Sequence, residues 1–415
     1  MTVQTQEVAV QGYCDPRFDE VAAELRRNFA ERGELGASVA VTVGGETVVD
    51  LWGGWADSER SRPWEQDTIC LIMSCTKGVV ALAAHMLAVE GLLDFDTPVA
   101  HYWPEFAAAG KDGVLVRHVL SHQAGVPVFR TPVEPGVFYD WERVVELLAA
   151  EELWWQPGRA YGYHAMTWGF LVGELVRRVT GIGIGQFVRE EIAEPLGLDL
   201  WIGLPASEHA RVSHFNPAPP PAPGELVPGF LVQAMTDPTS LPGLMLGNTG
   251  GYFLPEEWDS PAALQAAIPA CGGVGNARAL ASMYRALVHD RRVGRVSLGF
   301  ADVVRMGAVQ SALSEDVVLG GPGRWTLGFH KGTVTARGIE PPARCVLSED
   351  AFGHTGHGGS IGFADPVADL SFAYVMNQMD PDLGLSAKGQ SLVDATYRAL
   401  GYEPGHGAWV RDPRS

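Results

Sequence analysis

Residues 72–80 read IMSCTKGVV, and the interpretation of the whole chain depends on this stretch. It places a hydroxyl, Ser74, and an amine, Lys77, three residues apart at the start of an apolar helical pattern. Side chains with this spacing share one face of a helix. A serine at a helix N-terminus lies beside free backbone N–H groups, and a lysine partly buried between helices can lose its proton and accept that of the serine. The pair therefore predicts an acyl-enzyme apparatus that needs no histidine.

Ser-x-x-Lys alone also fits a helix cap followed by a surface lysine, so its weight depends on two further motifs. Residues 157–165 read PGRAYGYHA, a turn that carries Tyr163 shortly before a helix expected to begin near Met166. Residues 352–360 read FGHTGHGGS, a Gly-rich turn before a late strand. The three motifs in this order indicate a serine enzyme rather than an isolated helix cap.

This ordered set resembles the class C β-lactamases, the family VIII carboxylesterases and the D-aminopeptidases, in the superfamily of penicillin-binding proteins and serine β-lactamases. Residues 90–94, EGLLD, and 120–125, LSHQAG, match the pattern of that group too, so the resemblance covers most of the chain. It implies an α+β fold with an antiparallel sheet, flanked by helices, and a mostly helical inserted domain. The active site is expected in the cleft between the two.

By the same resemblance, Ser74 is the nucleophile, Lys77 is its activating partner, and Tyr163 assists as a phenolate or as a proton relay. Tyr161 competes for that role, but Tyr163 lies closer to the start of the helix. The backbone N–H groups of Ser74 and His357 would form the oxyanion hole, and the His357 side chain is given no role.

Two positions depart from the β-lactamase pattern. Where those enzymes carry Lys-Thr-Gly, whose lysine helps to bind a substrate carboxylate, this chain has the substrate-binding candidates His354, Thr355 and Gly356. The group also carries an asparagine two residues after the tyrosine, where this chain has Ala165. Both changes are of the kind seen in the esterase branch, so they favour an esterase over an antibiotic hydrolase.

The flanking sequence predicts a sheet built from both ends of the chain. Near the N-terminus, a helical pattern over 15–32 precedes two β-rich runs, 37–43 and 47–52, which Gly44 and Gly45 join as a hairpin. Helices are expected at 77–90, 116–120, 141–151, 167–180, 184–192, 277–288 and 385–400, and late strands near 325–330, 361–364 and 370–376. We therefore predict a sheet domain from 1–66 and 271–415 and a mostly helical domain from 67–270, with a Pro-rich surface loop or lid at 217–228.

Composition restricts the partners of the protein. The 415 residues carry a formal charge of −19, which opposes binding to nucleic acids and anionic membranes, and no apolar run has membrane-spanning length. The first ten residues lack the basic and apolar regions of an export signal, and the five cysteines follow no ligand spacing. We expect a cytoplasmic protein with reduced thiols, no metal and no cofactor, acting on a small-molecule ester or amide. The oligomeric state stays open.

Two other nucleophiles compete with Ser74. Residues 358–362, GGSIG, fit the G-x-S-x-G elbow of α/β-hydrolases, but a strand rather than a helix is expected after Ser360. Cys75 adjoins Ser74, although a small buried residue on the back of the helix is the simpler interpretation. Neither displaces Ser74.

Four functional hypotheses follow. The first is hydrolysis of a carboxylic ester through a Ser74 acyl-enzyme, with Lys77 and Tyr163 as the base. A transacylase would instead pass the acyl group to an amine or alcohol, and nothing in the sequence separates these acceptors from water. β-Lactamase or D-aminopeptidase activity is disfavoured by Ala165 and His354, and a non-catalytic binding protein by the presence of all three reactive side chains.

Overall fold

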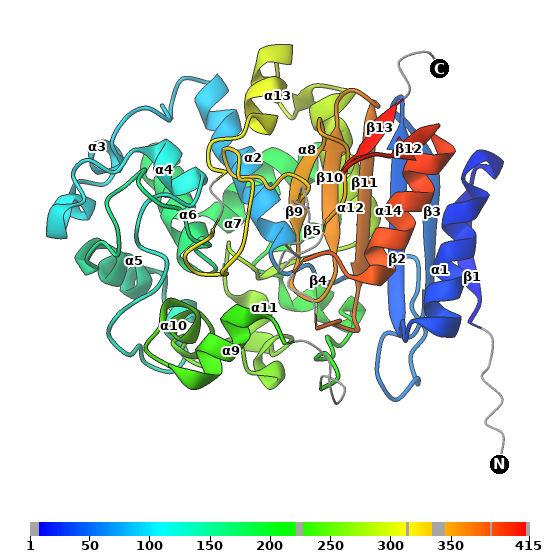
Figure 1. The fold of residues 1–415 in the computed structure, drawn as a ribbon, viewed down its shortest axis with the longest axis horizontal. Coiled ribbons are helices and arrows are strands. Elements are labelled where there is room, and N and C mark those ends of the chain that lie inside the picture. The colour runs from blue at the N-terminus through cyan, green and yellow to red at the C-terminus, as the bar shows by residue number, and fades with distance from the viewer. Residues whose placement is uncertain (1–7, 221–226, 313–314, 334–344, 382–383, 412–415) are drawn as a thin grey trace.

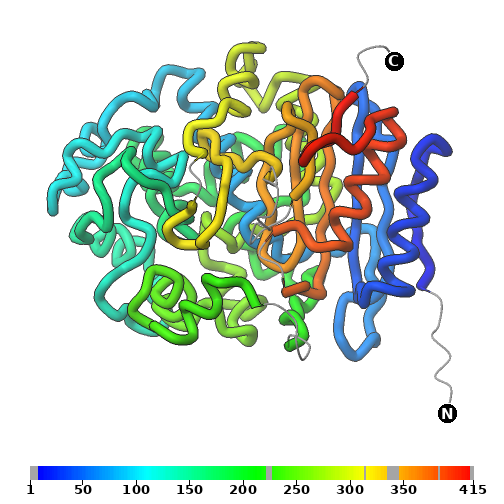
Figure 2. Tube along the Cα trace, in the orientation of Figure 1, coloured from blue at the N-terminus to red at the C-terminus, as the bar shows by residue number. Residues whose placement is uncertain are grey.

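The computed structural model describes residues 8–220, 227–312, 315–333, 345–381 and 384–411 (Figure 1). Its main feature is an antiparallel sheet to which both ends of the chain contribute. The strands follow the order β1 (Val10–Cys14), β3 (Glu46–Gly54), β2 (Gly36–Val43), β11 (Leu370–Met376), β10 (Ile361–Asp365) and β9 (Phe352–Thr355). In Figure 2 the blue N-terminal and the orange to red C-terminal segments accordingly lie side by side in one half of the molecule. The predicted α+β fold is confirmed.

Helices cover both faces of this sheet. Gly362 of β10 faces Tyr284 of α12 (Ala277–Val288), whereas the next residue, Phe363, stacks on Tyr397 of α14 (Ala387–Ala399). Because successive strand residues point to opposite faces, α12 and α14 lie on opposite sides of the sheet. The helix α1 (Asp19–Glu31) packs beside α14. Strand β2 is therefore enclosed and almost wholly buried.

The other half of the molecule is mostly helical. Its helices are α2 (Cys75–Val89), α3 (Val99–Tyr102), α4 (Val116–Leu120), α5 (Trp141–Ala150), α6 (Thr167–Thr180), α7 (Ile184–Phe187), α8 (Glu194–Leu196), α9 (Gly229–Thr236), α10 (Leu241–Gly247) and α11 (Pro261–Gln265). A small sheet of β4 (Cys70–Leu71), β6 (Gly273–Gly275) and β5 (Leu200–Ile202) joins this half to the sheet domain. Outside these groups lie α13 (Phe300–Gly307) and the two-stranded pairs β7 (Arg292–Val293) with β8 (Val296–Ser297) and β12 (Tyr402–Pro404) with β13 (Trp409–Arg411). Short 3₁₀- and π-helical segments occur between the larger elements.

Helix α2 connects the two halves. It packs against β9 and β10 on one side and against α6 on the other (Figure 1). Nearly all of its residues are buried, which is typical of a helix that is apolar around its whole circumference. The start of α2 is therefore held rigidly where the sheet meets the helical half.

Local patterns account for the regular elements and fail for the shortest ones. Gly44 and Gly45 adopt φ of +58° and +80°, as the predicted tight hairpin turn requires. The strand expected at 325–330 is wrong, because Gly328 at φ +96° turns the chain and Trp325 pairs with His330 by an isolated bridge. The loop predicted at 217–228 falls largely in 221–226, outside the described residues. The division into domains stays a prediction.

Candidate active site

Ser74 is the residue immediately before α2 and is partly exposed in a cavity. In the first helical turn, the N–H groups of Cys75 and Thr76 donate to the carbonyls of Ile72 and Met73, so they are not free to bind a ligand as the sequence suggested. Met73, the preceding residue, has φ of +45°, a left-handed conformation that costs a non-glycine residue free energy. Backbone strain next to a reactive side chain is common at functional sites.

Lys77 is fully buried, one turn into α2, and its ammonium group points back to Ser74. Its Nζ lies 3.2 Å from Ser74 Oγ and donates to the backbone carbonyls of Ala165 at 2.8 Å and Ala270 at 2.9 Å. Among the described residues no carboxylate forms an ion pair with Lys77, so burial dominates and lowers its pKa to about 7. A large fraction of this amine is therefore neutral near physiological pH.

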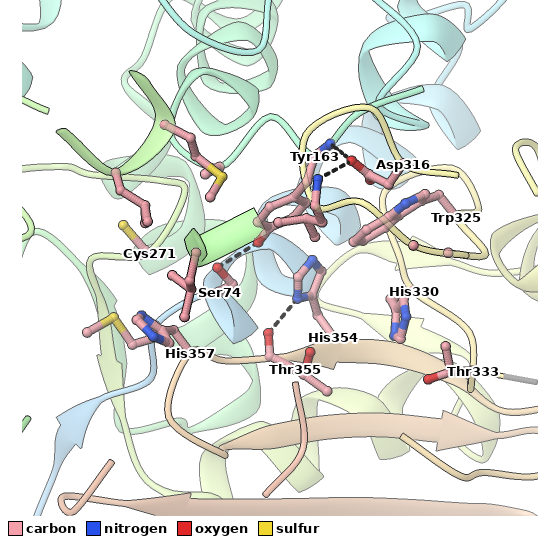
Figure 3. A pocket seen from close by; sticks show the side chains of 18 of the residues that line it. Ser74, Tyr163, Cys271, Asp316, Trp325, His330, Thr333, His354, Thr355 and His357 are labelled. Atoms are coloured by element: carbon pink, nitrogen blue, oxygen red, sulfur yellow. Dashed lines mark hydrogen bonds between the residues drawn. The ribbon is translucent and has the colours of Figure 1, made fainter. Parts of the chain in front are cut away.

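Tyr163 is the second polar side chain, after Lys77, that contacts the Ser74 hydroxyl. Its phenolic O–H donates to Ser74 Oγ at 2.8 Å (Figure 3). Lys77 Nζ lies 4.8 Å from the centre of its ring. The ring stacks on Trp325, with centroids 5.3 Å apart. Burial raises the pKa of Tyr163, so the neutral phenol is the stable form. The competing residue, Tyr161, directs its hydroxyl to the Gly323 N–H, from which it accepts a hydrogen bond, rather than to Ser74.

The third predicted motif lies at the end of β9, opposite Tyr163. Nδ1 of His354 bonds to the Thr355 carbonyl at 2.7 Å and therefore carries the proton, so Nε2 is a bare acceptor (Figure 3). Burial keeps the pKa of His354 well below its usual range, so the ring is neutral. A side chain at Gly356 would collide with the Ile72 carbonyl, so this strand end approaches the residues before Ser74 closely. His357 is partly exposed and lines the cavity.

These residues surround a cavity of about 360 Å³. Ser74, Tyr163, His354, Thr355 and His357 line it directly, whereas Lys77 and Gly356 lie in the layer behind. The structure thus brings together every site residue that the sequence predicts. The cavity also contains residues that the sequence analysis missed: Leu231, Met245, Leu246, Phe253, Asp316, Leu319, Trp325 and His330.

Helices α9 and α10 form an apolar roof over this cavity, supplied by Leu231, Met245 and Leu246. The roof belongs to a small apolar cluster, separate from the main core, that includes Phe230, Met245 and Val318. The only local signal for it is the apolar content of 229–247, which a buried core helix would share.

The competing nucleophiles do not reach the cavity. Cys75 Sγ points away toward the His354 carbonyl, is fully buried, and has its pKa raised to about 12 by burial. Ser360 is buried in the connection between two strands, β9 and β10, rather than between a strand and a helix. In the described part of the chain, no cluster of His, Cys, Asp and Glu is arranged to hold a metal, and no helix could cross a membrane.

Comparison with known proteins is consistent with this geometry. Among curated proteins, esterase/beta-lactamase LipL of Mycobacterium tuberculosis (strain ATCC 25618 / H37Rv) is 35% identical over 384 residues, 89% of this chain and 83% of that protein. A family VIII carboxylesterase of known structure is 38% identical, with a TM-score of 0.82, over 94% of this chain and 100% of that one. A penicillin-binding protein homologue from Caulobacter crescentus has the same identity and coverage and a TM-score of 0.80.

The relatives bear out the resemblance expected from the three motifs and support an enzyme of the serine hydrolase type. The sequence profile described as Beta-lactamase matches residues 21–395, which is most of the chain. This protein therefore belongs to the beta-lactamase family.

Proposed function

We propose that this protein hydrolyses uncharged carboxylic esters through an acyl-enzyme on Ser74. The observation that carries the proposal is that Ser74 Oγ lies within hydrogen-bonding distance of both Lys77 Nζ and the Tyr163 hydroxyl, at the edge of a largely apolar cavity. The named esterases among the relatives support it.

Lys77 acts as the base in the first step. In its neutral form, two N–H bonds serve the carbonyls of Ala165 and Ala270, and the remaining lone pair faces the Ser74 hydroxyl. The proton passes from Ser74 to Lys77 as Oγ bonds to the acyl carbon. Ala165 contributes only its backbone to this arrangement, so the loss of the family's asparagine leaves the contact with Lys77 intact.

Tyr163 relays a proton to the leaving group. Because its pKa is raised, it works as a phenol that donates its proton to the departing alkoxide and regains one from Lys77. The C–O bond breaks, the alcohol leaves, and a water molecule attacks the acyl-enzyme by the reverse route. The N–H groups of Ser74 and His357 are proposed to bind the oxyanion, each contributing about 3 kcal/mol.

The electrostatics of the cavity favour an uncharged substrate. No lysine or arginine is among its lining residues in the described part of the chain, and the neutral His354 stands where the β-lactamases have a cation. A substrate carboxylate would lose its hydration without gaining a charged partner. An ester without a carboxylate avoids that cost.

Tyr163→Phe tests the relay. The variant keeps the ring stacked on Trp325 but lacks the hydroxyl, so we expect kcat for a p-nitrophenyl ester to fall by about 100-fold or more. The matched variant Tyr161→Phe removes the hydroxyl of the competing tyrosine, and its kcat should fall less than about tenfold. Equal losses in the two variants would contradict a relay through Tyr163.

The roof predicts selectivity for acyl length. In Leu231→Trp, the larger side chain fills cavity space, so kcat/KM for an octanoate ester should fall by about tenfold or more while that for an acetate ester changes little. Val232→Trp is the control, because Val232 neighbours Leu231 on α9 but is 47% exposed. A uniform loss with both esters in Leu231→Trp would show that the roof does not contact the acyl chain.

β-Lactam hydrolysis is the second candidate, because the relative LipL is known as an esterase/beta-lactamase. The neutral His354 ranks it below ester hydrolysis. Turnover of a chromogenic cephalosporin as fast as that of a p-nitrophenyl ester would reverse this order. The same ester assayed with an added amine or alcohol tests for a transacylase, since hydrolysis alone yields only the free acid.

A further inference from the structure

One wall of the cavity is a closed loop of residues 316–323. The Asp316 N–H donates to the Gly321 carbonyl at 2.7 Å, and the Gly320 N–H donates to the Asp316 carbonyl at 2.8 Å. This loop supplies Leu319, Gly321 and neighbouring residues to the lining. It is attached to the segment before α6, because the Val317 N–H donates to the Tyr161 carbonyl at 3.1 Å.

The Asp316 side chain joins this loop to Tyr163. Its Oδ1 accepts three backbone N–H groups, from Tyr163 at 3.1 Å and from Val318 and Leu319 at 2.9 Å each. Figure 3 shows Asp316 beside the backbone of Tyr163, at the end opposite the hydroxyl that reaches Ser74. A single oxygen atom therefore fixes both the proposed proton relay and the cavity wall.

This contact is costly to the fold. Asp316 is 2% exposed, no basic side chain in the described residues forms an ion pair with it, and its Oδ2 has no hydrogen-bond partner there. Burial raises its pKa to about 6. A buried carboxylate with an unsatisfied oxygen destabilises a protein, and such groups persist where the surrounding structure needs them.

We propose that Asp316 is a positioning residue that holds Tyr163 against Ser74 and holds the loop 316–323 in place as the cavity wall. The inference rests on the proposed function for the role of Tyr163. Charged acceptors form stronger hydrogen bonds than neutral ones, so Asp316 holds Tyr163 and the loop most firmly when its carboxyl group is ionised. The titratable side chains that interact electrostatically with Asp316 are Tyr161 and Tyr163, and both stay neutral near pH 6. Glu315 is the residue immediately before the loop.

Two variants separate the acceptor from its charge. Asp316→Asn keeps an oxygen for the three N–H groups but stays neutral, whereas Asp316→Ala removes the acceptor. We expect the ratio of wild-type to Asp316→Asn kcat to be near one below pH 5 and to rise through about pH 6 to several-fold at pH 8. Lys77 titrates in both proteins, so its effect on kcat cancels when the wild-type value is divided by that of the variant. Asp316→Ala should lose about 30-fold or more in kcat with little change in KM.

A ratio that does not depend on pH, or an Asp316→Ala variant as active as Asp316→Asn, would overturn the proposal. If Asp316→Ala does not fold, the pH dependence of the kcat ratio for Asp316→Asn still tests the proposal. Amide hydrogen exchange gives a readout independent of activity. At a fixed pH of 8, the amides of Val318, Leu319 and Tyr163 should exchange fastest in Asp316→Ala and at an intermediate rate in Asp316→Asn. If the wild type lacks esterase activity but these amides exchange faster in the variants, the proposed function is wrong and the positioning role of Asp316 stands. If their exchange is unchanged in the variants, Asp316 does not hold Tyr163 and the loop.

Discussion

Replacing Ser74 with alanine is expected to lower kcat/KM for a p-nitrophenyl ester by about 10⁴-fold or more. Lys77 and Tyr163 both direct their polar atoms at Ser74 Oγ, and alanine has no atom there that could form the acyl-enzyme. Two measurements are made on the wild type and the variant: steady-state kinetics, and the intact mass of the protein after brief exposure to the ester. The wild type should gain the mass of one acyl group and the variant none.

Cys75→Ala is the matched control for this experiment. The Cys75 thiol adjoins Ser74 in sequence, but its raised pKa of about 12 and its contact with the His354 carbonyl keep it unreactive and outside the cavity. This variant should acylate like the wild type. An adduct that survives in Ser74→Ala and disappears in Cys75→Ala would instead identify a thiol enzyme.

Lys77→Met has the second largest expected effect, a loss of about 10³-fold in kcat. Methionine fills similar space without a base, and it removes the cost of burying an amine, so the variant should remain folded. In the wild type, the neutral base predominates above its pKa of about 7, so kcat/KM should rise from pH 5 to pH 8 with a midpoint near that value. A pH–rate profile of both proteins tests the two statements together.

Lys77→Arg distinguishes a base from a charge. Arginine keeps the positive charge but does not lose its proton in this pH range, so the variant should be as inactive as Lys77→Met. Thermal unfolding checks that both variants fold. Activity retained by Lys77→Arg, or a wild-type profile that is flat between pH 5 and pH 8, would mean that Lys77 acts only through its charge.

The sequence predicts best what a single continuous segment determines. The ranges 167–180 and 277–288 match α6 and α12, because their apolar spacing and their capping residues lie within the same stretch. Strands such as β4 and β5 have only two or three residues, too few to show an alternation. The stretch 352–360 reads as a Gly-rich turn in the sequence, but its first four residues, Phe352–Thr355, pair with β10 as strand β9.

The candidate site divides in the same way. Ser74 and Lys77 are visible as a pair because one helix turn sets their separation, and Tyr163 and His354 followed from the resemblance. The roles of Asp316 and Leu231 have no such signal, because Tyr163 and the cavity around Ser74 are distant from them in sequence and meet them only in the folded chain. A buried carboxylate that binds backbone amides looks like any surface aspartate in the sequence.

The cavity roof and the helix that carries Ser74 belong to different apolar clusters. Helix α2 is part of the main core, whereas Phe230 and Met245 of the roof belong to the small separate one. The small cluster also includes Ala165, and Tyr163 packs against it, so engineering of the roof has to keep these two residues in place. Substitutions confined to α9 and α10 act on this smaller cluster, whereas changes within α2 have to preserve the packing of both halves of the molecule at once.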